Sequence, residues 1–324
     1  MRRITLAGLA GFAGLVVFVV ACSGSKAGDG VVDAPGGGGG GDGDAPAAID
    51  APPSGAACAG KAAQPLDATW TLTVGGRTRT ARVHVPASYV PSARTPVVLN
   101  IHGRTSNSAS QANLSRAIAK SDAAGFVLVH PDSATSPTAW NAGSCCDPAT
   151  STNVDDVGFI GALLDELEAK LCVDTDRVYA MGLSNGAYLS HKLACEMADR
   201  IAAIGPVAGL LLQSPCSPSR PVPVMMVNGT SDNLSLYQFV GQAVTFWKGK
   251  NGCTTEGVSF QNGDTTCVTQ GGCTGGADVT LCTVDGGGHQ WPGGEALPLL
   301  GKKSDAIIAT DALWAFFVAH PRTP

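Results

Sequence analysis

The sequence predicts an α/β fold in which a mainly parallel β-sheet is covered by helices on both faces. Short apolar runs rich in β-branched residues alternate with longer helix-favouring segments over most of the chain. This alternation is typical of successive βαβ units, and the runs are continuously apolar, as expected of strands buried on both faces. The segment from Cys58 to Pro324 is long enough for one such domain of ordinary size.

The N-terminal part is expected to lie outside this domain. Two arginines, an apolar run over residues 4–21 and Cys22 resemble a bacterial lipoprotein signal, so we predict a signal peptide over residues 1–22 with Cys22 lipidated. An uncleaved membrane anchor and ordinary signal cleavage are the alternatives. Residues 23–57 have almost nothing large and apolar to bury, which predicts a disordered tether before a domain over residues 58–324. We therefore expect export, with the protein lipid-anchored at the cell envelope, on the outer membrane or cell surface, or secreted.

Charge and cysteine content indicate which partners the chain lacks and whether its cysteines form disulfides or a metal site. The formal net charge is −5 and no basic cluster occurs, so no nucleic-acid partner is predicted. No stretch after the signal is long and apolar enough to span a membrane. Ten of the eleven cysteines follow Cys22, and an even number in an exported chain indicates disulfides. A zinc site is the alternative, but the chain has no Cys-x-x-Cys pair.

Two particular disulfides are predicted. The segments around Cys267 and Cys282 have the pattern of strands on either side of a Gly-rich turn, which would place the two cysteines opposite each other. We expect Cys267 to pair with Cys282 and Cys253 to pair with Cys273. Peptide mapping without reduction tests both.

The elements of the domain follow from local signals. Gly75-Gly76 between two alternating segments indicates a hairpin, and the apolar run after Pro96 indicates a buried central strand. The predicted strands, in chain order, are 69–74, 80–85, 96–101, 126–130, 178–181, 202–207, 222–227 and 279–284. The predicted helices are 109–123, 154–171, 187–200, 237–250 and 304–320.

A long polar loop is expected over residues 131–153. Loops of this length in a compact domain are often functional, and this one contains Trp140 and the adjacent Cys145-Cys146. Asp155 and Asp156 begin the helix that follows. A catalytic role is conceivable for these acids, but carboxylates in a first helical turn usually interact with the helix dipole, and we favour that interpretation.

The candidate nucleophile is Ser184, within Gly182-Leu183-Ser184-Asn185-Gly186. With 42 glycines in the chain, a G-x-S-x-G pattern alone is a weak signal. Here an apolar strand precedes it and a helix-favouring segment follows it, which predicts the strained strand-turn-helix of a nucleophile elbow. Glycines two positions on either side let the strand and helix pass without a Cβ clash.

A serine hydroxyl needs a base, and the base needs an orienting carboxylate. Of the six histidines, only His289 lies downstream of Ser184 in a glycine-rich loop after a strand. Asp232 follows a strong apolar strand and is the preferred acid; Asp264 and Asp285 are its rivals. The alternative roles are a surface histidine and a turn-forming aspartate.

An oxyanion hole needs two N–H donors aimed at the developing charge. One is expected from the backbone of Asn185, the residue after the nucleophile. The other is expected from the backbone of Arg104, in the loop after the strand that ends at Ile101. His102 is expected to shape that loop without transferring protons.

Taken together, these motifs resemble a family of secreted esterases that includes polyhydroxybutyrate depolymerases and the feruloyl and acetyl xylan esterases of carbohydrate esterase family 1. The resemblance runs from about Cys58 to the C-terminus. It rests on His102-Gly103, Trp140-Asn141-Ala142-Gly143 with Cys145-Cys146, Val154-Asp155-Asp156-Val157, Gly182-Leu183-Ser184-Asn185-Gly186, Gly229-Thr230-Ser231-Asp232 and Gly287-Gly288-His289-Gln290-Trp291-Pro292-Gly293.

The resemblance implies an α/β-hydrolase fold and a serine esterase without metal or cofactor, with Ser184, Asp232 and His289 as its triad. The substrates implied are feruloyl or acetyl esters of polysaccharide, or hydroxyalkanoate oligomers, and we expect a monomer. Trp140 and Trp291 are candidate walls of the substrate site, with core packing as the alternative. A serine peptidase on the same fold and a non-catalytic surface binding module remain the other functions considered.

Three residues depart from the family pattern. Asn100 and Arg104 flank the oxyanion loop, where apolar or small residues are expected, and Asn228 stands where a histidine is common. These departures leave the chemistry intact but change the expected substrate preference. The Arg104 side chain is either a contact for an anionic acyl group or a solvated surface residue.

Overall fold

The computed structural model describes residues 58–322. The predicted signal peptide over residues 1–22, the lipidation of Cys22 and the tether over residues 23–57 lie outside the described residues and stay predictions. None of the helices within the described residues combines the length and apolar character needed to cross a membrane.

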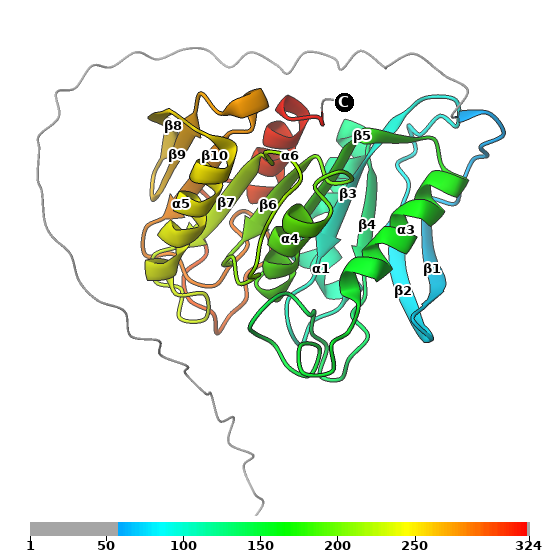
Figure 1. The fold of residues 1–324 in the computed structure, drawn as a ribbon, viewed down its shortest axis with the longest axis horizontal. Helices are drawn as coiled ribbons and strands as arrows, with labels where there is room; N and C mark the ends of the chain where they lie inside the picture. The colour runs from blue at the N-terminus through cyan, green and yellow to red at the C-terminus, as the bar shows by residue number, and fades with distance from the viewer. Residues whose placement is uncertain (1–57, 323–324) are drawn as a thin grey trace, which may run out of the picture. The chain divides into compact units, whose positions relative to one another are not determined.

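The domain is built on one twisted ten-stranded sheet with the order β1-β2-β4-β3-β5-β6-β7-β10-β9-β8 (Figure 1). The six strands from β4 to β10 in this order run parallel, while a hairpin at each end adds antiparallel strands. The predicted mainly parallel sheet is therefore confirmed. The strands are β1 (Asp67–Val74), β2 (Arg77–His84), β3 (Thr95–Ile101), β4 (Val127–Pro131), β5 (Val173–Leu183), β6 (Ala203–Val207), β7 (Val224–Gly229), β8 (Thr255–Asn262), β9 (Thr265–Gly271) and β10 (Val279–Val284).

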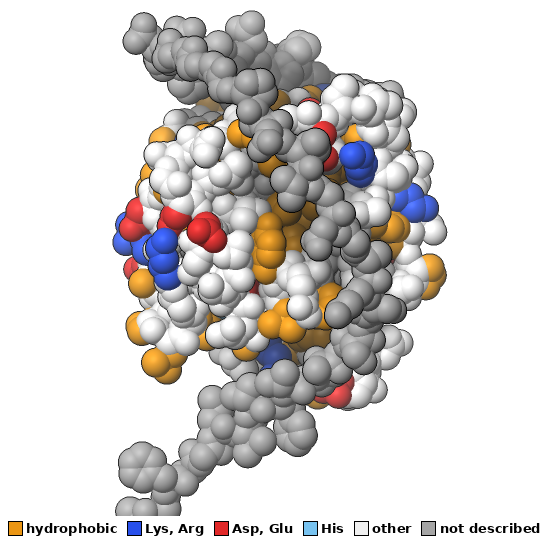
Figure 2. Space-filling view, turned by 90° about the vertical axis from the view of Figure 1, so that its left-hand side faces the viewer, with side chains coloured by type: hydrophobic (Ala, Val, Ile, Leu, Met, Phe, Trp, Pro, Cys, Tyr) orange, Lys and Arg blue, Asp and Glu red, His pale blue; other side chains and the backbone are white. Residues whose placement is uncertain are grey.

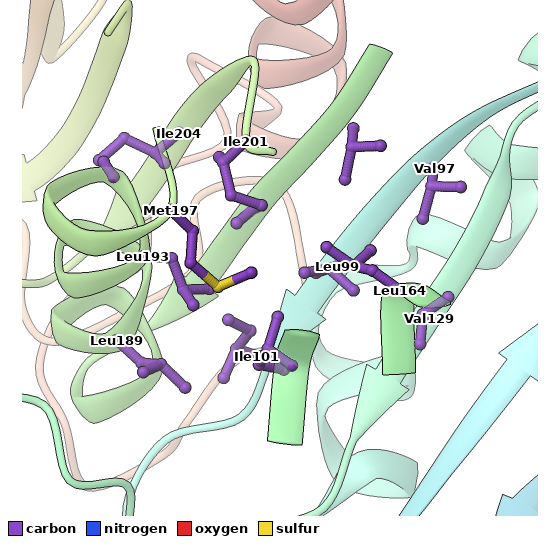
Figure 3. Packing of buried hydrophobic residues seen from close by; sticks show 14 of the residues in the cluster. Val97, Leu99, Ile101, Val129, Leu164, Leu189, Leu193, Met197, Ile201 and Ile204 are labelled. Carbon is purple, nitrogen blue, oxygen red and sulfur yellow. The ribbon is translucent and has the colours of Figure 1, made fainter. Parts of the chain in front are cut away.

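Helices cover both faces of the sheet, and the central strand β3 shows why. Its residues are all buried, and alternate side chains belong to different cores because successive side chains of a strand point to opposite faces. Val97, Leu99 and Ile101 pack with one set of helices, and Val98 packs with the other. Figure 3 shows the first core, between the sheet and helices α3 (Asp156–Lys170) and α4 (Asn185–Glu196).

The remaining helices complete the two layers. Trp247 of α5 (Val240–Asn251) belongs to the same core as α3 and α4. Leu114 of α1 (Ser108–Ser115), Ala117 of α2 (Ala117–Ala124) and Leu313 of α6 (Ala309–Ala319) belong to the core on the opposite face. This arrangement is the layered α/β architecture that the alternation of apolar runs predicted.

Two predicted helices need correction, and one strand was not predicted. The single helix expected over residues 109–123 is two helices, because Arg116 adopts a left-handed conformation with φ 55° between α1 and α2. The last helix begins at Ala309, five residues later than expected. Strand β8 was not predicted, because its side chains are exposed along its whole length and it carries no continuous apolar run.

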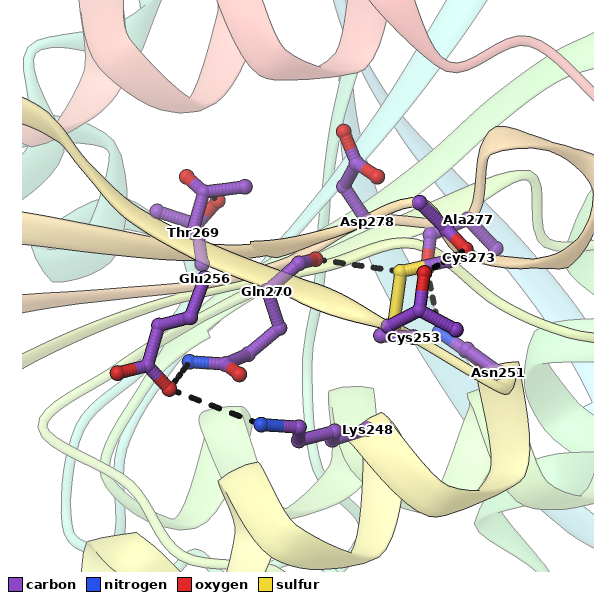
Figure 4. The surroundings of a disulfide bond; sticks show 12 residues. Lys248, Asn251, Cys253, Glu256, Thr269, Gln270, Cys273, Ala277 and Asp278 are labelled. Carbon is purple, nitrogen blue, oxygen red and sulfur yellow. Dashed lines mark hydrogen bonds and ion pairs between the residues drawn. A yellow bond between two sulfur atoms is a disulfide. The ribbon is translucent and has the colours of Figure 1, made fainter.

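Five disulfides cross-link the described chain, and they include both predicted pairs, Cys267–Cys282 and Cys253–Cys273. Cys267 and Cys282 face each other in the antiparallel register of β9 and β10. Figure 4 shows Cys253–Cys273 beside β8, where Glu256 accepts a hydrogen bond from Gln270 at 2.6 Å. The pairs not predicted are Cys58–Cys172, Cys145–Cys146 and Cys195–Cys216.

Candidate active site

Ser184 lies between the end of β5 and the start of α4, with φ 55° and ψ −120°. A positive φ is rare for a residue with a side chain and indicates local strain. The flanking glycines explain how the turn is accommodated. A Cβ on Gly182 would lie 2.7 Å from the Gly186 carbonyl oxygen, and a Cβ on Gly186 would lie 2.2 Å from the Ile101 carbonyl oxygen. The steric reason given for both glycines is therefore confirmed.

Asp232 and His289 are held together in the interior. The Nδ1 atom of His289 lies 2.8 Å from Oδ2 of Asp232, and both residues are buried. The other carboxylate oxygen of Asp232 accepts hydrogen bonds from the backbone N–H groups of Leu234 and Ser235, each at 2.8 Å. With the carboxylate as acceptor, neutral His289 carries its proton on Nδ1 and keeps the lone pair of Nε2 for another donor.

Glycines also bring the histidine loop onto the end of β7. A Cβ on Gly229 would lie 2.2 Å from the Gly287 carbonyl oxygen, so the two backbones meet directly. The backbone N–H of His289 donates to the Leu300 carbonyl at 2.7 Å, which fixes the loop from its other side. The rival acids are engaged elsewhere: Lys302 and Ser304 lower the pKa of Asp264 to about 2, and Asp285 accepts from Thr230.

The loop after β3 lies directly against the nucleophile. A Cβ on Gly103 would lie 3.5 Å from Cβ of Ser184. Among the described residues, neither the backbone N–H of Arg104 nor that of Asn185 has a hydrogen-bond partner. Two free backbone donors therefore lie near Ser184, one on the next residue and one in the loop after β3, as an oxyanion hole requires.

His102 is a structural residue of this loop. Its Nε2 accepts a hydrogen bond from the Ser133 N–H at 3.2 Å, so the ring proton is on Nδ1, which donates to the Gly103 carbonyl at 2.7 Å. Burial lowers the pKa of His102, which keeps the ring neutral. This geometry supports the expectation that His102 shapes the loop.

The prediction that Trp140 and Trp291 form walls of the substrate site needs correction. Both side chains are 0% exposed. The indole N–H of Trp291 donates to Thr310 at 3.0 Å and that of Trp140 donates to the His102 carbonyl at 2.9 Å. Both rings are packed into the interior with their polar atoms satisfied, so packing, the alternative, describes them.

Half-buried apolar groups lie close to the site instead. Gly209 packs against the elbow, since a Cβ there would lie 3.5 Å from the Ser184 carbonyl oxygen, and Leu210, Leu211 and Leu212 follow it. The backbone at Gly143 touches Leu212, which brings the Cys145–Cys146 disulfide to the same side. No sequence signal distinguished these leucines from core residues.

The three departures from the family pattern have different surroundings. Asn100 is buried and bonds to Gln111, Ser115 and His130, so its side chain faces the interior. The Nδ2 group of Asn228 donates to the Gly209 carbonyl at 3.2 Å.

Arg104 is exposed, and its guanidinium donates to the Asp147 carbonyl at 3.2 Å. It thus ties the oxyanion loop to the segment with the Cys145–Cys146 disulfide.

One buried ion pair was not predicted from the sequence. Arg79 of β2 donates to Asp156 of α3 at 2.7 Å, and both side chains are almost fully buried. Burial raises the pKa of Asp156 and lowers that of Arg79. Asp155 is the N-cap of α3 and accepts from the Gly158 N–H, close to the expected role at the helix terminus. Arg79 and Asp156 are 77 positions apart in the sequence, so no local pattern signals their contact.

Residues 58–322 contain no group of three or more His, Cys, Asp or Glu side chains placed to bind a metal ion. The site geometry consists of a serine at an elbow, an oriented histidine and two free backbone donors. Such an arrangement has what nucleophilic acyl transfer requires.

Comparison with known proteins places this chain in a family. Residues 82–250, just over half of the chain, match the family model described as esterase PHB depolymerase. Feruloyl esterase B of Piromyces equi is 33% identical over 232 residues, which are 64% of this chain and 42% of that protein. The putative esterase NocK of Nocardia uniformis subsp. tsuyamanensis is 34% identical over 175 residues, 52% of this chain and 50% of that protein. The chain thus spans about half the length of these relatives, or less.

Solved structures show the same fold at low identity. The acetyl xylan esterase from Aspergillus awamori matches with a TM-score of 0.59 at 15% identity, covering 78% of this chain and 99% of that one. Native pOPH matches with a TM-score of 0.54 at 18% identity, covering 82% and 89%. With an α/β-hydrolase fold and the matching family model, the chain belongs to the esterase PHB depolymerase family.

Proposed function

We propose that this chain is a carboxylic ester hydrolase that works through a covalent acyl intermediate on Ser184. One observation carries the proposal: His289 is fixed on Asp232 at 2.8 Å in a domain whose elbow presents Ser184. Family membership supports the same reaction, since esterases define the matched family. Ser184 is half-buried, so its hydroxyl can meet a substrate while its surroundings are partly desolvated.

In the proposed mechanism, Nε2 of His289 removes the hydroxyl proton of Ser184 as its oxygen attacks the ester carbonyl carbon. Asp232 keeps the imidazole oriented and stabilises the imidazolium that forms. The tetrahedral oxyanion is held by the N–H groups of Asn185 and Arg104. The imidazolium then gives its proton to the departing alkoxide, and the acyl-enzyme is released as a free acid by water that His289 activates.

Two features of the site guide the choice of substrate. Leu210, Leu211 and Leu212 are half-buried and follow Gly209, which packs against the elbow, and we propose that they contact an aryl or short alkyl group of an ester. Relatives are named feruloyl esterase and acetylxylan esterase/xylanase. We propose feruloyl or acetyl esters of polysaccharide, or hydroxyalkanoate oligomers, as the substrate class.

We also propose that the domain works outside the cytoplasm, where the predicted signal and lipid anchor would place it. Five disulfides in the described chain support export, because such bonds form and persist in oxidising compartments.

The decisive experiment compares the wild type with Ser184→Ala. Initial rates would be measured on methyl ferulate, acetylated xylan, hydroxybutyrate oligomers and short nitrophenyl esters, together with matched peptide amides. We expect ester hydrolysis to fall by about 10⁴-fold or more in the variant, with circular dichroism unchanged.

A fluorophosphonate probe should label the wild type, with mass spectrometry locating the adduct on Ser184. Ester turnover that survives Ser184→Ala would rule out the mechanism. Faster cleavage of amides than of esters would favour a peptidase, and a folded wild type that neither turns over esters nor reacts with the probe would favour a binding module.

A further inference from the structure

The two backbone donors proposed for the oxyanion hole lie on separate segments. Arg104 belongs to the loop after β3, and Asn185 is the first residue of α4. Nothing in the covalent chain keeps these donors at a fixed separation, because they are 81 positions apart in the sequence. Catalysis by such a pair requires both N–H groups to be held in place before the charge develops.

Residues 138–141 contact both segments. On one side, the indole N–H of Trp140 donates to the His102 carbonyl at 2.9 Å. The N–H of Thr105 donates to the Thr138 carbonyl at 2.8 Å, and the Thr138 hydroxyl donates to the Ser106 carbonyl at 2.7 Å. The loop that carries Arg104 is therefore bonded to this segment both before and after Arg104.

On the other side, the segment is bonded to the start of α4. The backbone N–H of Trp140 donates to Oδ1 of Asn185 at 2.7 Å, and Nδ2 of Asn185 donates back to the Trp140 carbonyl at 3.1 Å. Both residues are buried, so water does not compete for these bonds. The side chain of Asn185 thereby locks the same residue whose N–H is a proposed oxyanion donor.

Residues 138–141 are also bonded to α3 and to a later part of α4. The Asn141 N–H donates to Asp156 at 2.7 Å, and Asp156 is paired with Arg79. Lys192 of α4 donates to the Asn141 carbonyl at 3.0 Å. Such a set of buried, mutually satisfied bonds gives a rigid support, since each bond restricts the groups that make the next.

We infer that Trp140 is a positioning residue for the oxyanion hole, which sets the separation of the Asn185 and Arg104 donors by bonding both of their segments. The inference rests on the proposed function, because it concerns the reaction assigned to Ser184. Trp140 does not touch the substrate, being fully buried. Its indole N–H is the part of the side chain that reaches the oxyanion loop, so replacing it by a ring without a donor releases that contact while keeping most of the packing.

The test is Trp140→Phe in the full-length protein, with 4-nitrophenyl acetate as substrate. We expect kcat to fall about 10- to 100-fold with KM changed less than about twofold, because an ångström-scale displacement of an aligned group costs about 10²-fold. Inhibition by an aryl trifluoromethyl ketone, whose adduct with serine carries an oxyanion, should weaken by the same factor. Inhibition by the product acid should not change.

Trp247→Phe is the matched control. Its indole N–H also makes a buried hydrogen bond, to Nδ1 of His191 at 3.1 Å. Trp247 lies on α5, and His191 lies in the middle of α4, beyond the first turn that carries Asn185. We expect the control to lose thermal stability as Trp140→Phe does while keeping kcat and trifluoromethyl ketone affinity. Asn185→Ala, which removes both bonds to the Trp140 backbone but retains its own N–H, should reproduce the loss of kcat.

Each outcome decides the inference. Equal kcat in Trp140→Phe and Trp247→Phe, or a rise in KM with unchanged ketone affinity, would overturn it. If Trp140→Phe does not fold, Asn185→Ala with unchanged kcat would overturn it equally. A wild type that neither hydrolyses the ester nor binds the ketone would instead overturn the proposed function, and the inference with it. Failure of the inference alone leaves an active wild type, so the two failures can be distinguished.

Discussion

The centre of the sheet and its β8 end are held together by different means. At the centre, residues 138–141, the loop after β3 and the start of α4 are joined by buried hydrogen bonds between segments distant in sequence. At the other end, β8 is exposed along its length, and two disulfides close short spans of 15 and 20 residues. The candidate active site therefore depends on contacts between segments distant in sequence, whereas the β8 end is cross-linked between segments close in sequence.

The surface at the β8 end is apolar and grooved. Figure 2 faces this end and shows apolar side chains gathered in the middle of the surface. A groove of about 570 Å³ lies here between the sheet and α6, lined by residues that include Met225, Phe260 and Phe316. This open groove borders the exposed strand β8, whereas the segments around Ser184 are joined by buried hydrogen bonds.

The largest expected difference between the two regions comes from one glycine substitution in each. Gly186→Ala puts a Cβ 2.2 Å from the Ile101 carbonyl oxygen, and we expect a loss of about 3 kcal/mol or more in the free energy of unfolding, together with most activity. Gly257→Ala lies on β8 with no atom within 4 Å of the new Cβ. This control should be neutral or stabilise by up to about 1 kcal/mol. Urea unfolding measures both, and a strongly destabilising Gly257→Ala would contradict the comparison.

Removing the Cys253–Cys273 disulfide should separate stability from catalysis. The double variant Cys253→Ser/Cys273→Ser opens a span of 20 residues, so we expect a loss of about 3 kcal/mol in the free energy of unfolding. Because this cross-link lies at the β8 end, kcat at 25 °C should stay within about twofold of the wild type while the protein remains folded. A large fall in kcat of the folded variant would show that this end shapes the site.

The smallest expected effect concerns Asp264, at the turn between β8 and β9. Lys302 and Ser304 lower the pKa of its carboxyl group to about 2 in the folded protein, below the ordinary value of 3.8. A depressed pKa means that the carboxylate stabilises the fold above about pH 4 and loses this contribution as the pH falls towards 2. Asp264→Asn should therefore be less stable than the wild type at pH 6, by less than about 1 kcal/mol because the ion pair is near the surface.

Urea titrations at several pH values measure this difference, which should shrink between pH 4 and pH 2. A difference that stays constant over that range would mean that the Asp264 charge does not contribute. Lys302→Met, which removes the partner cation, should show the same dependence on pH.

Local patterns in the sequence predicted much of the fold and part of the candidate site. The hairpin at Gly75-Gly76, the buried strand β3 and the Cys267–Cys282 pair were recognised because turn residues, apolar runs and short spans leave signals in neighbouring positions. The contact of Asp232 with His289 could also be anticipated, since both follow strands of a parallel sheet and those strand ends meet at one edge.

Other features were decided only by the tertiary structure. Trp140, an expected wall of the substrate site, is buried and links the loop after β3 to the start of α4. Burial is a property of the packed chain, not of the residue type. The Arg79–Asp156 pair and the Cys58–Cys172 disulfide join positions 77 and 114 residues apart, where no local pattern can reveal the partner. The sequence by itself determined most of the elements and the chain order of the candidate triad. Folding decided which buried bonds hold distant segments together, because those bonds depend on contacts that no local pattern encodes.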